Sequence, residues 1–227
     1  MTHPANLIVM RYMCVPTRKA PTRNATCTLF VLIHTTTHSA MSDNNSPVIL
    51  LTGGSRGLGL AIANYLLTNS AAKLFVVARG AASLAALKDS YPAGRIEVLA
   101  GDLGEFGIGV AAVRKAVEVF GKLDAVVVNH GVLDPTARIE DADVEAWKTC
   151  FNINYFSAVE IVKEAIPALR VSRGRVVFVS SGAATTPYVA WGAYGGTKAA
   201  MNHFASTLGA EEKGFTSISI QPGVVGM

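Results

Sequence analysis

Apolar and polar positions follow a repeating order along the chain from residue 47 onward. Short apolar runs rich in Val, Ile and Leu are each followed by a longer segment whose apolar residues recur at helical spacing. The short runs predict strands at 48–52, 74–78, 96–100, 123–128, 175–179 and 217–221. The segments between them predict helices at 58–67, 83–90, 109–120, 144–169 and 193–213, with Pro167 in the last turn of the fourth helix.

Strands that are apolar along their whole length are typical of a parallel sheet that helices cover on both faces. The alternation therefore predicts an α/β fold with a doubly wound parallel sheet of six strands. A chain of 227 residues suits one domain, and no linker interrupts residues 47–227.

The first 40 residues have a different composition, with eight threonines, three prolines, four basic residues and no acid. Such a composition resembles a mitochondrial transit peptide, although the prolines disfavour the amphipathic helix that such a peptide needs. Met41 resembles an ordinary start just before the first strand. We therefore expect residues 1–46 to be a disordered leader or a misassigned start, and the protein to be cytoplasmic. The alternative is a working transit signal and a mitochondrial protein.

Charge and cysteine content exclude several classes of protein. The net charge of +4 lies wholly in the first 40 residues, and the remainder is balanced, so no basic face for a nucleic acid is indicated. No apolar run approaches the roughly 18 residues of a membrane span. The three cysteines show neither metal-binding nor disulfide spacing, and Cys150 is expected to be a small buried side chain.

A glycine-rich segment follows the first predicted strand directly and leads into the first predicted helix. Its glycines allow a tight turn and let the backbone approach a pyrophosphate at the helix N-terminus. In this strand–loop–helix context we interpret the segment as a dinucleotide site. The residues concerned are Thr52, Gly53, Ser55, Arg56, Gly57, Leu58 and Gly59.

Tyr194 and Lys198 lie one helical turn apart in the fifth predicted helix, so their side chains point the same way. A nearby cation lowers the pKa of a phenol toward working pH, which suits acid chemistry. Ser181, at the end of the fifth strand, has a hydroxyl that could orient a substrate carbonyl. The Tyr-x-x-x-Lys spacing alone is weak evidence, and it gains weight from the dinucleotide site upstream.

The two motifs together resemble the short-chain dehydrogenase/reductase family, over residues 48–227. Further matches, in chain order, are Asp102-Leu103, Asn129-His130-Gly131, Asn154, Ser181 and Pro222-Gly223, with His130 standing where the family pattern has alanine. Residues 191–198 and 202–204 are most similar to the sepiapterin reductase and benzil reductase group. The resemblance implies a Rossmann-type sheet.

The resemblance also implies an activity, namely reduction of a ketone or diketone carbonyl by hydride transfer from NADPH, with Tyr194 as the proton donor. Lys198 would lower the pKa of Tyr194 and hold the nicotinamide ribose, Ser181 would bind the carbonyl oxygen, and Asn154 would anchor a water. Relatives often pair through helices corresponding to 144–169 and 193–213, so a homo-oligomer is expected. Besides Tyr194, Lys198 and the glycine-rich segment, the implied cofactor contacts are Arg79, Asp102, Leu103, Asn129, Gly131, Pro222 and Gly223.

Charge argues for NADPH over NADH. An NAD site places an acid about 20 residues beyond the glycines, on the ribose 2′-hydroxyl. Here that point is Ala78-Arg79, with no acid. Arg56 and Arg79 could instead bind a 2′-phosphate, for which the guanidinium fork is well shaped.

The sequence ends at Met227, four residues after Gly223. The family pattern would place a threonine, a substrate-binding segment and a seventh strand after this point. We therefore expect weak activity from this chain. A non-catalytic dinucleotide-binding protein is the alternative function.

Overall fold

The computed structural model describes residues 46–223. The leader predicted at 1–46 lies almost entirely outside the described residues, as do Cys14 and Cys27. Six strands form the sheet: β1 (Val48–Thr52), β2 (Lys73–Ala78), β3 (Ile96–Ala100), β4 (Ala125–Val128), β5 (Arg175–Val179) and β6 (Thr216–Ile220). The α-helices are α1 (Gly57–Asn69), α2 (Ala81–Asp89), α3 (Ile108–Phe120), α4 (Val144–Phe151), α5 (Ser157–Ser172) and α6 (Gly192–Glu211).

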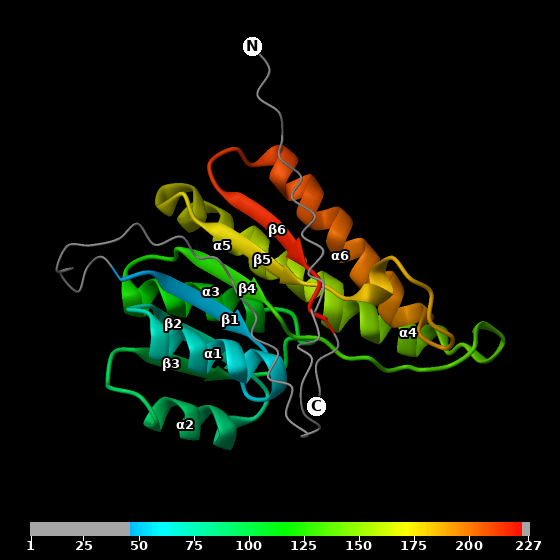
Figure 1. Cartoon of the computed structure of the whole chain (residues 1–227), viewed down its shortest axis with the longest axis horizontal. Helices are drawn as coiled ribbons and strands as arrows, with labels where there is room; N and C mark the ends of the chain where they lie inside the picture. Colours follow the sequence, from blue (N-terminus) through cyan, green and yellow to red (C-terminus); the bar gives the residue numbers. More distant parts are fainter. Residues whose placement is uncertain (1–45, 224–227) are drawn as a thin grey trace, which may run out of the picture.

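All strand pairs are parallel and the order across the sheet is β3-β2-β1-β4-β5-β6 (Figure 1). The predicted α/β fold with a doubly wound, six-stranded sheet is thereby confirmed. The chain order reverses between β1 and β4, and in open α/β sheets the carboxyl ends of the strands at such a point form the ligand-binding crevice. This order determines where the candidate site lies.

Alternate residues of each strand serve opposite faces of the sheet, because side chains of a strand point up and down in turn. Leu50 and Val126 belong to the larger core cluster, with α3, α5 and α6. Leu51 and Val76 belong to the other cluster, with α1 and α2. Within residues 46–223, no helix combines the length and apolar character needed to cross a bilayer.

The long helix predicted at 144–169 is continuous in the structure, but it is not α-helical throughout. The chain forms α4, then a π-helical turn, η3 (Asn152–Phe156), and then α5. The N–H of Ser157 donates to the carbonyl oxygen of Asn152, five residues back. This wider turn carries Asn154 inward, where its amide binds the backbone of Val132. Turns of this kind are frequent at functional sites, and hydrophobic periodicity does not reveal them.

Pro167 does not mark a last turn either, because α5 continues to Ser172. The proline has no N–H to donate to the carbonyl of Lys163, but both residues are exposed, so water can bind that carbonyl. The helix ends where Arg173 takes a left-handed conformation, with φ of 51°.

Candidate active site

The carboxyl ends of β1, β4 and β5 lie side by side and carry most of the predicted site residues. The glycine-rich segment follows β1, residues Asn129 to Gly131 follow β4, and Ser181 follows β5. The first turns of α6 add Tyr194 and Lys198, and η3 adds Asn154. The fold thus gathers, at one edge of the sheet, residues that lie up to about 145 positions apart in the sequence.

The glycine-rich segment has the backbone of a phosphate cradle. Gly53 and Gly57 have positive φ, 69° and 53°, which L side chains rarely adopt. A Cβ added at Gly59 would collide with the carbonyl oxygen of Gly53, so only glycine fits there. Arg56 precedes α1 without a side-chain cap, and the first turn of α1 holds no acid. The uncapped N–H groups are therefore available to an anion, and the residues fit a dinucleotide pyrophosphate.

Asn129 and Thr52 hold this segment against β4. The Asn129 side-chain amide donates to the carbonyl oxygens of Thr52 and Gly53, both at 3.1 Å. The hydroxyl oxygen of the fully buried Thr52 accepts the Asn129 N–H at 2.9 Å. Asn129 thus shapes the loop after β1, and its predicted contact with the cofactor stays a prediction.

The ends of β2 and β3 correct the expectation that no acid lies near Arg79. An acid does face Arg79, since its guanidinium lies 3.8 Å from the carboxylate of Asp102. Sequence distance from the glycines missed it because β2 and β3 end beside each other, with Ala78 opposite Ala100. The ion pair is long and both side chains are exposed, so it is weak and leaves the guanidinium accessible.

The remaining predicted cofactor residues differ in exposure. Leu103 is buried in the core, so only its backbone could contact a ligand. Arg56 is exposed at the start of α1, and Ser55 and Leu58 are half-buried beside it. After β6, Pro222 is half-buried and Gly223 is exposed.

Lys198 is almost fully buried, with 3% of its surface exposed. Its ammonium donates to the carbonyl oxygen of Val179 at 2.8 Å and lies 5.7 Å from the centroid of the Tyr194 ring. Burial lowers the pKa of Lys198 to about 8, because desolvation penalises the charged form. The predicted Tyr–Lys pair is thus brought together, with the cation held at the end of β5.

Asn154 is fully buried, and its amide binds the backbone of Val132 in both directions at 2.8 Å. It also donates to the Thr197 hydroxyl at 3.1 Å, and that hydroxyl donates to the carbonyl oxygen of Tyr194 at 2.7 Å. A Cβ at Gly131 would lie 3.2 Å from the Asn154 amide oxygen and 3.6 Å from the Lys198 ammonium. Asn154 and Lys198 therefore border the same small space at Gly131.

Ser181 begins the short turn η4 (Gly182–Ala184), where its hydroxyl oxygen accepts the Ala183 N–H at 3.2 Å. A hydroxyl that accepts in this way still has its proton to donate. The turn packs on the start of α6, because a Cβ at Gly195 would lie 2.9 Å from the carbonyl oxygen of Ala183. Ser181 and the neighbouring Tyr194 thus lie on segments that contact each other.

Aromatic rings adjoin Tyr194 on its outer side. The Trp191 ring meets it edge-on at 5.9 Å, and Tyr188 lies 5.1 Å from Trp191. Ala190, between them, has φ of 67°, and the N–H of Ala137 donates to its carbonyl oxygen at 3.1 Å. This contact joins the segment after β4 to the segment after β5.

Three buried residues contact the site although the sequence analysis assigned them no role in it: His130, Cys150 and Thr197. Cys150 is 1% exposed, as predicted, and its sulfur accepts from the Asn154 amide at 3.5 Å. Cys150 lies four residues before Asn154 and Thr197 three after Tyr194, so helical spacing could have suggested both. Within the described part of the chain, no cluster of His, Cys, Asp or Glu could hold a metal.

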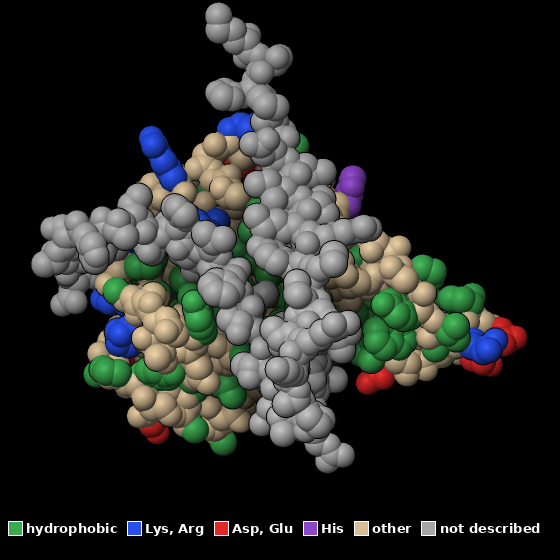
Figure 2. Space-filling model, viewed as in Figure 1, with side chains coloured by type: hydrophobic (Ala, Val, Ile, Leu, Met, Phe, Trp, Pro, Cys, Tyr) green, Lys and Arg blue, Asp and Glu red, His purple; other side chains and the backbone are tan. Residues whose placement is uncertain are grey.

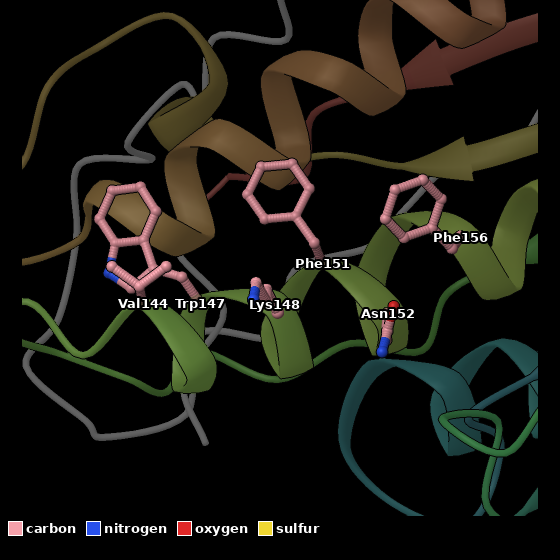
Figure 3. A pocket seen from close by; sticks show the side chains of 6 residues that line it. All are labelled: Val144, Trp147, Lys148, Phe151, Asn152 and Phe156. Carbon is pink, nitrogen blue, oxygen red and sulfur yellow. The ribbon is translucent and has the colours of Figure 1, made fainter.

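An apolar groove of about 440 Å³ lies outside this site, along α4 and η3. Figure 3 shows the rings of Trp147, Phe151 and Phe156 in a row on the side facing α6, with Asn152 pointing away. Figure 2 shows hydrophobic side chains gathered at the end of the molecule that carries α4. Exposed residues in and next to α4 include Ile139 and Val144.

Comparison with known proteins agrees with this geometry. Residues 47–226 match the family model of the short chain dehydrogenases. An uncharacterised oxidoreductase of Schizosaccharomyces pombe is 45% identical, over 82% of this chain and 73% of its own. The benzil reductase ((S)-benzoin forming) of Saccharomyces cerevisiae is 37% identical, over 78% and 71%.

Solved structures give the same result. An enzyme described as KRED1-Pglu has a TM-score of 0.77 and 42% identity, and the match covers 79% of this chain and 75% of that one. A short chain dehydrogenase/reductase of Saccharomyces cerevisiae has a TM-score of 0.75 and 42% identity, over 79% and 71%. With this fold, this glycine-rich segment and these relatives, the chain belongs to the short-chain dehydrogenase/reductase family of oxidoreductases.

Proposed function

We propose that the protein reduces a ketone or diketone carbonyl to an alcohol with NADPH, and that Tyr194 is the proton donor. The observation that carries this proposal is the buried Lys198, whose ammonium lies 5.7 Å from the centroid of the Tyr194 ring. A cation placed there stabilises the negative charge that develops at Tyr194 in the transition state of proton transfer. NADPH, when bound, supplies the hydride.

Each remaining member of the set has a role that its contacts support. Lys198, anchored on Val179, has further N–H groups to donate toward a cofactor ribose. The Ser181 hydroxyl has its proton free for the substrate oxygen. The Asn154 amide nitrogen donates to Val132, Thr197 and Cys150. Its oxygen accepts from Val132 and has one further lone pair that can hold a water near Lys198.

Two exposed arginines support the preference for NADPH: Arg79, directly after β2, and Arg56, directly before α1. Asp102 is the competing acid, but its contact with Arg79 is long and exposed. A 2′-phosphate carries more charge than one carboxylate and matches the guanidinium fork. It would therefore displace Asp102 as the partner of Arg79.

An aromatic carbonyl compound is the proposed substrate class. Trp191 presents a flat apolar surface next to Tyr194, and the half-exposed Tyr188 ring lies against Trp191. Aromatic rings in contact add about 0.5–1.5 kcal/mol beyond the area that they bury. The benzil reductase relative acts on such a compound by its name.

The experiment is turnover of benzil by the purified chain, followed by loss of NADPH absorbance. Tyr194→Phe should reduce the rate by at least about a hundredfold, because general acid catalysis contributes factors of this size. Its affinity for NADPH should stay within about twofold of the wild type, since the hydroxyl acts in the transition state. Unchanged turnover in Tyr194→Phe, or no turnover in the wild type, would overturn the proposal.

We also propose that the protein acts as a homo-oligomer in the cytoplasm. The groove along α4 and the exposed Val144 and Phe156 offer an apolar surface that a second copy would cover. A Saccharomyces cerevisiae protein of 42% identity and TM-score 0.70 is described as cytoplasmic.

A further inference from the structure

His130 occupies a central place that the reaction itself does not require. It is 8% exposed and lies at the end of β4, between the glycine-rich segment and the π turn η3. Its Nδ1 is 2.7 Å from the Thr52 hydroxyl oxygen. Its Nε2 is 2.7 Å from the Ser157 hydroxyl oxygen and 3.0 Å from the carbonyl oxygen of Ile153.

The partners select one tautomer. The carbonyl oxygen of Ile153 can only accept, so Nε2 must carry the proton. The Ser157 hydroxyl donates to the same carbonyl at 2.6 Å, which leaves its oxygen to accept from Nε2. Nδ1 is then bare and accepts from the Thr52 hydroxyl at 2.7 Å, a shorter contact than the 3.2 Å from that hydroxyl to the carbonyl oxygen of Val127. The Thr52 oxygen already accepts the N–H groups of Asn129 and His130, so it has no lone pair left for a protonated Nδ1. Every polar atom of the ring is satisfied only when the ring is neutral.

The two ends of this chain of hydrogen bonds serve different parts of the site. Thr52 holds the loop after β1, because its carbonyl and hydroxyl oxygens both bind Asn129. Ile153 and Ser157 flank Asn154, whose amide binds Val132 and Thr197. Through His130, the segment that would hold the pyrophosphate is tied to the turn that holds Asn154.

We propose that His130 is a positioning residue that sets the glycine-rich segment and the π turn relative to each other through its two ring nitrogens. The proposal rests on the dinucleotide site and the catalytic set described under Proposed function. Burial favours the neutral ring that the geometry requires, since desolvation and the charge of Lys198 lower the pKa of His130 to about 4, against smaller opposing effects of the hydrogen bond to Ile153 and the charge of Asp102.

Two substitutions separate the two links. An asparagine amide reaches as far as Nδ1, so His130→Asn keeps an acceptor for Thr52 and loses the donor to Ser157. A glutamine amide reaches as far as Nε2, so His130→Gln keeps the donor to Ser157 and loses the acceptor for Thr52. Ile161→Val is the matched control, because Ile161 is fully buried one turn beyond Ser157 and makes none of these hydrogen bonds.

Three quantities are measured for each folded variant: the dissociation constant of NADPH, kcat with benzil, and hydrogen exchange of the Val132 N–H. His130→Gln should weaken NADPH binding about tenfold with kcat nearly unchanged, a loss of the size of one hydrogen bond. His130→Asn should lower kcat about tenfold and speed exchange at Val132, whose N–H binds Asn154, with NADPH affinity nearly unchanged. A general loss of packing would change all three together and would also appear in Ile161→Val.

Identical effects of His130→Asn and His130→Gln, or effects no larger than those of Ile161→Val, would overturn the proposal. A wild type that binds NADPH but does not reduce benzil would instead refute the proposed activity. NADPH affinity and exchange at Val132 would then still decide the role of His130. If NADPH does not bind either, exchange at Val132 alone decides the role of His130. The proposal then requires faster exchange in His130→Asn than in His130→Gln.

Discussion

Acidification should destabilise the fold through His130. The ring is buried and neutral in the folded protein, with a pKa of about 4 against the ordinary value of 6.5. In the unfolded chain it takes up a proton as the pH falls through 6.5, whereas in the folded chain it resists until about pH 4. Because the unfolded state binds more protons between these values, stability is complete above about pH 6.5 and falls as the pH drops toward 4.

The size of the loss follows from the shift in pKa. Each unit corresponds to about 1.4 kcal/mol, so the whole window of 2.5 units contributes about 3.5 kcal/mol. At pH 4.5 most of that loss, about 2.5 kcal/mol, is already present. Lys198 and Asp102 are the charged groups that act on the ring, Lys198 lowering and Asp102 raising the pKa of His130. Lys198, with a pKa of about 8, keeps most of its charge from pH 7 to pH 4.5.

The assay is urea unfolding of the wild type and of His130→Gln at pH 7 and at pH 4.5. The glutamine amide does not titrate, so the fall in the free energy of unfolding from pH 7 to pH 4.5 should be about 2.5 kcal/mol smaller in the variant. Carboxyl groups contribute equally to both proteins and cancel in this difference. Equal falls in the two proteins would refute the reasoning, because they would mean that His130 is free to take up a proton in the fold.

Three further outcomes test other parts of the structure. Arg79→Ala should weaken NADPH binding about tenfold and leave NADH binding unchanged, as measured by quenching of tryptophan fluorescence, whereas equal affinities that do not respond to the substitution would contradict the assignment. The rate of carbonyl reduction should fall as the pH rises through about 8, because Lys198 then loses the charge that assists Tyr194; a rate that stays level up to pH 9, roughly a unit above that pKa, would contradict this. Phe156→Glu should convert the oligomer to a monomer in sedimentation experiments, and a folded wild-type monomer at micromolar concentration would exclude the proposed assembly.

Local patterns predicted the parts of the site that depend on neighbours in the sequence. The spacing of Tyr194 and Lys198 places both on one side of α6, because helical geometry alone determines that relation. The alternation of strands and helices predicted the parallel sheet, because strands that are apolar along their whole length are typical of a sheet covered by helices on both faces. Gly53, Gly57 and Gly59 stand where the backbone needs positive φ or close approach.

Local sequence patterns did not predict contacts between residues that are distant in the chain. Asp102 faces Arg79 because β2 and β3 end side by side, a relation that counting residues from the glycines does not contain. The π turn inside the helix predicted at 144–169 carries Asn154, whose hydrogen bonds join it to Val132, 22 residues away.

The sequence by itself determined the elements, the sheet and the spacing of the motifs, because these follow from the periodicity of apolar residues and from backbone sterics. Only the tertiary structure decided what His130 does, since its partners Thr52 and Ser157 lie 78 and 27 residues away in the chain. A buried imidazole has no preferred role of its own. Its tautomer and charge are determined by the donors and acceptors that packing brings to its two nitrogens, and these become known only when the strands and the π turn are in place.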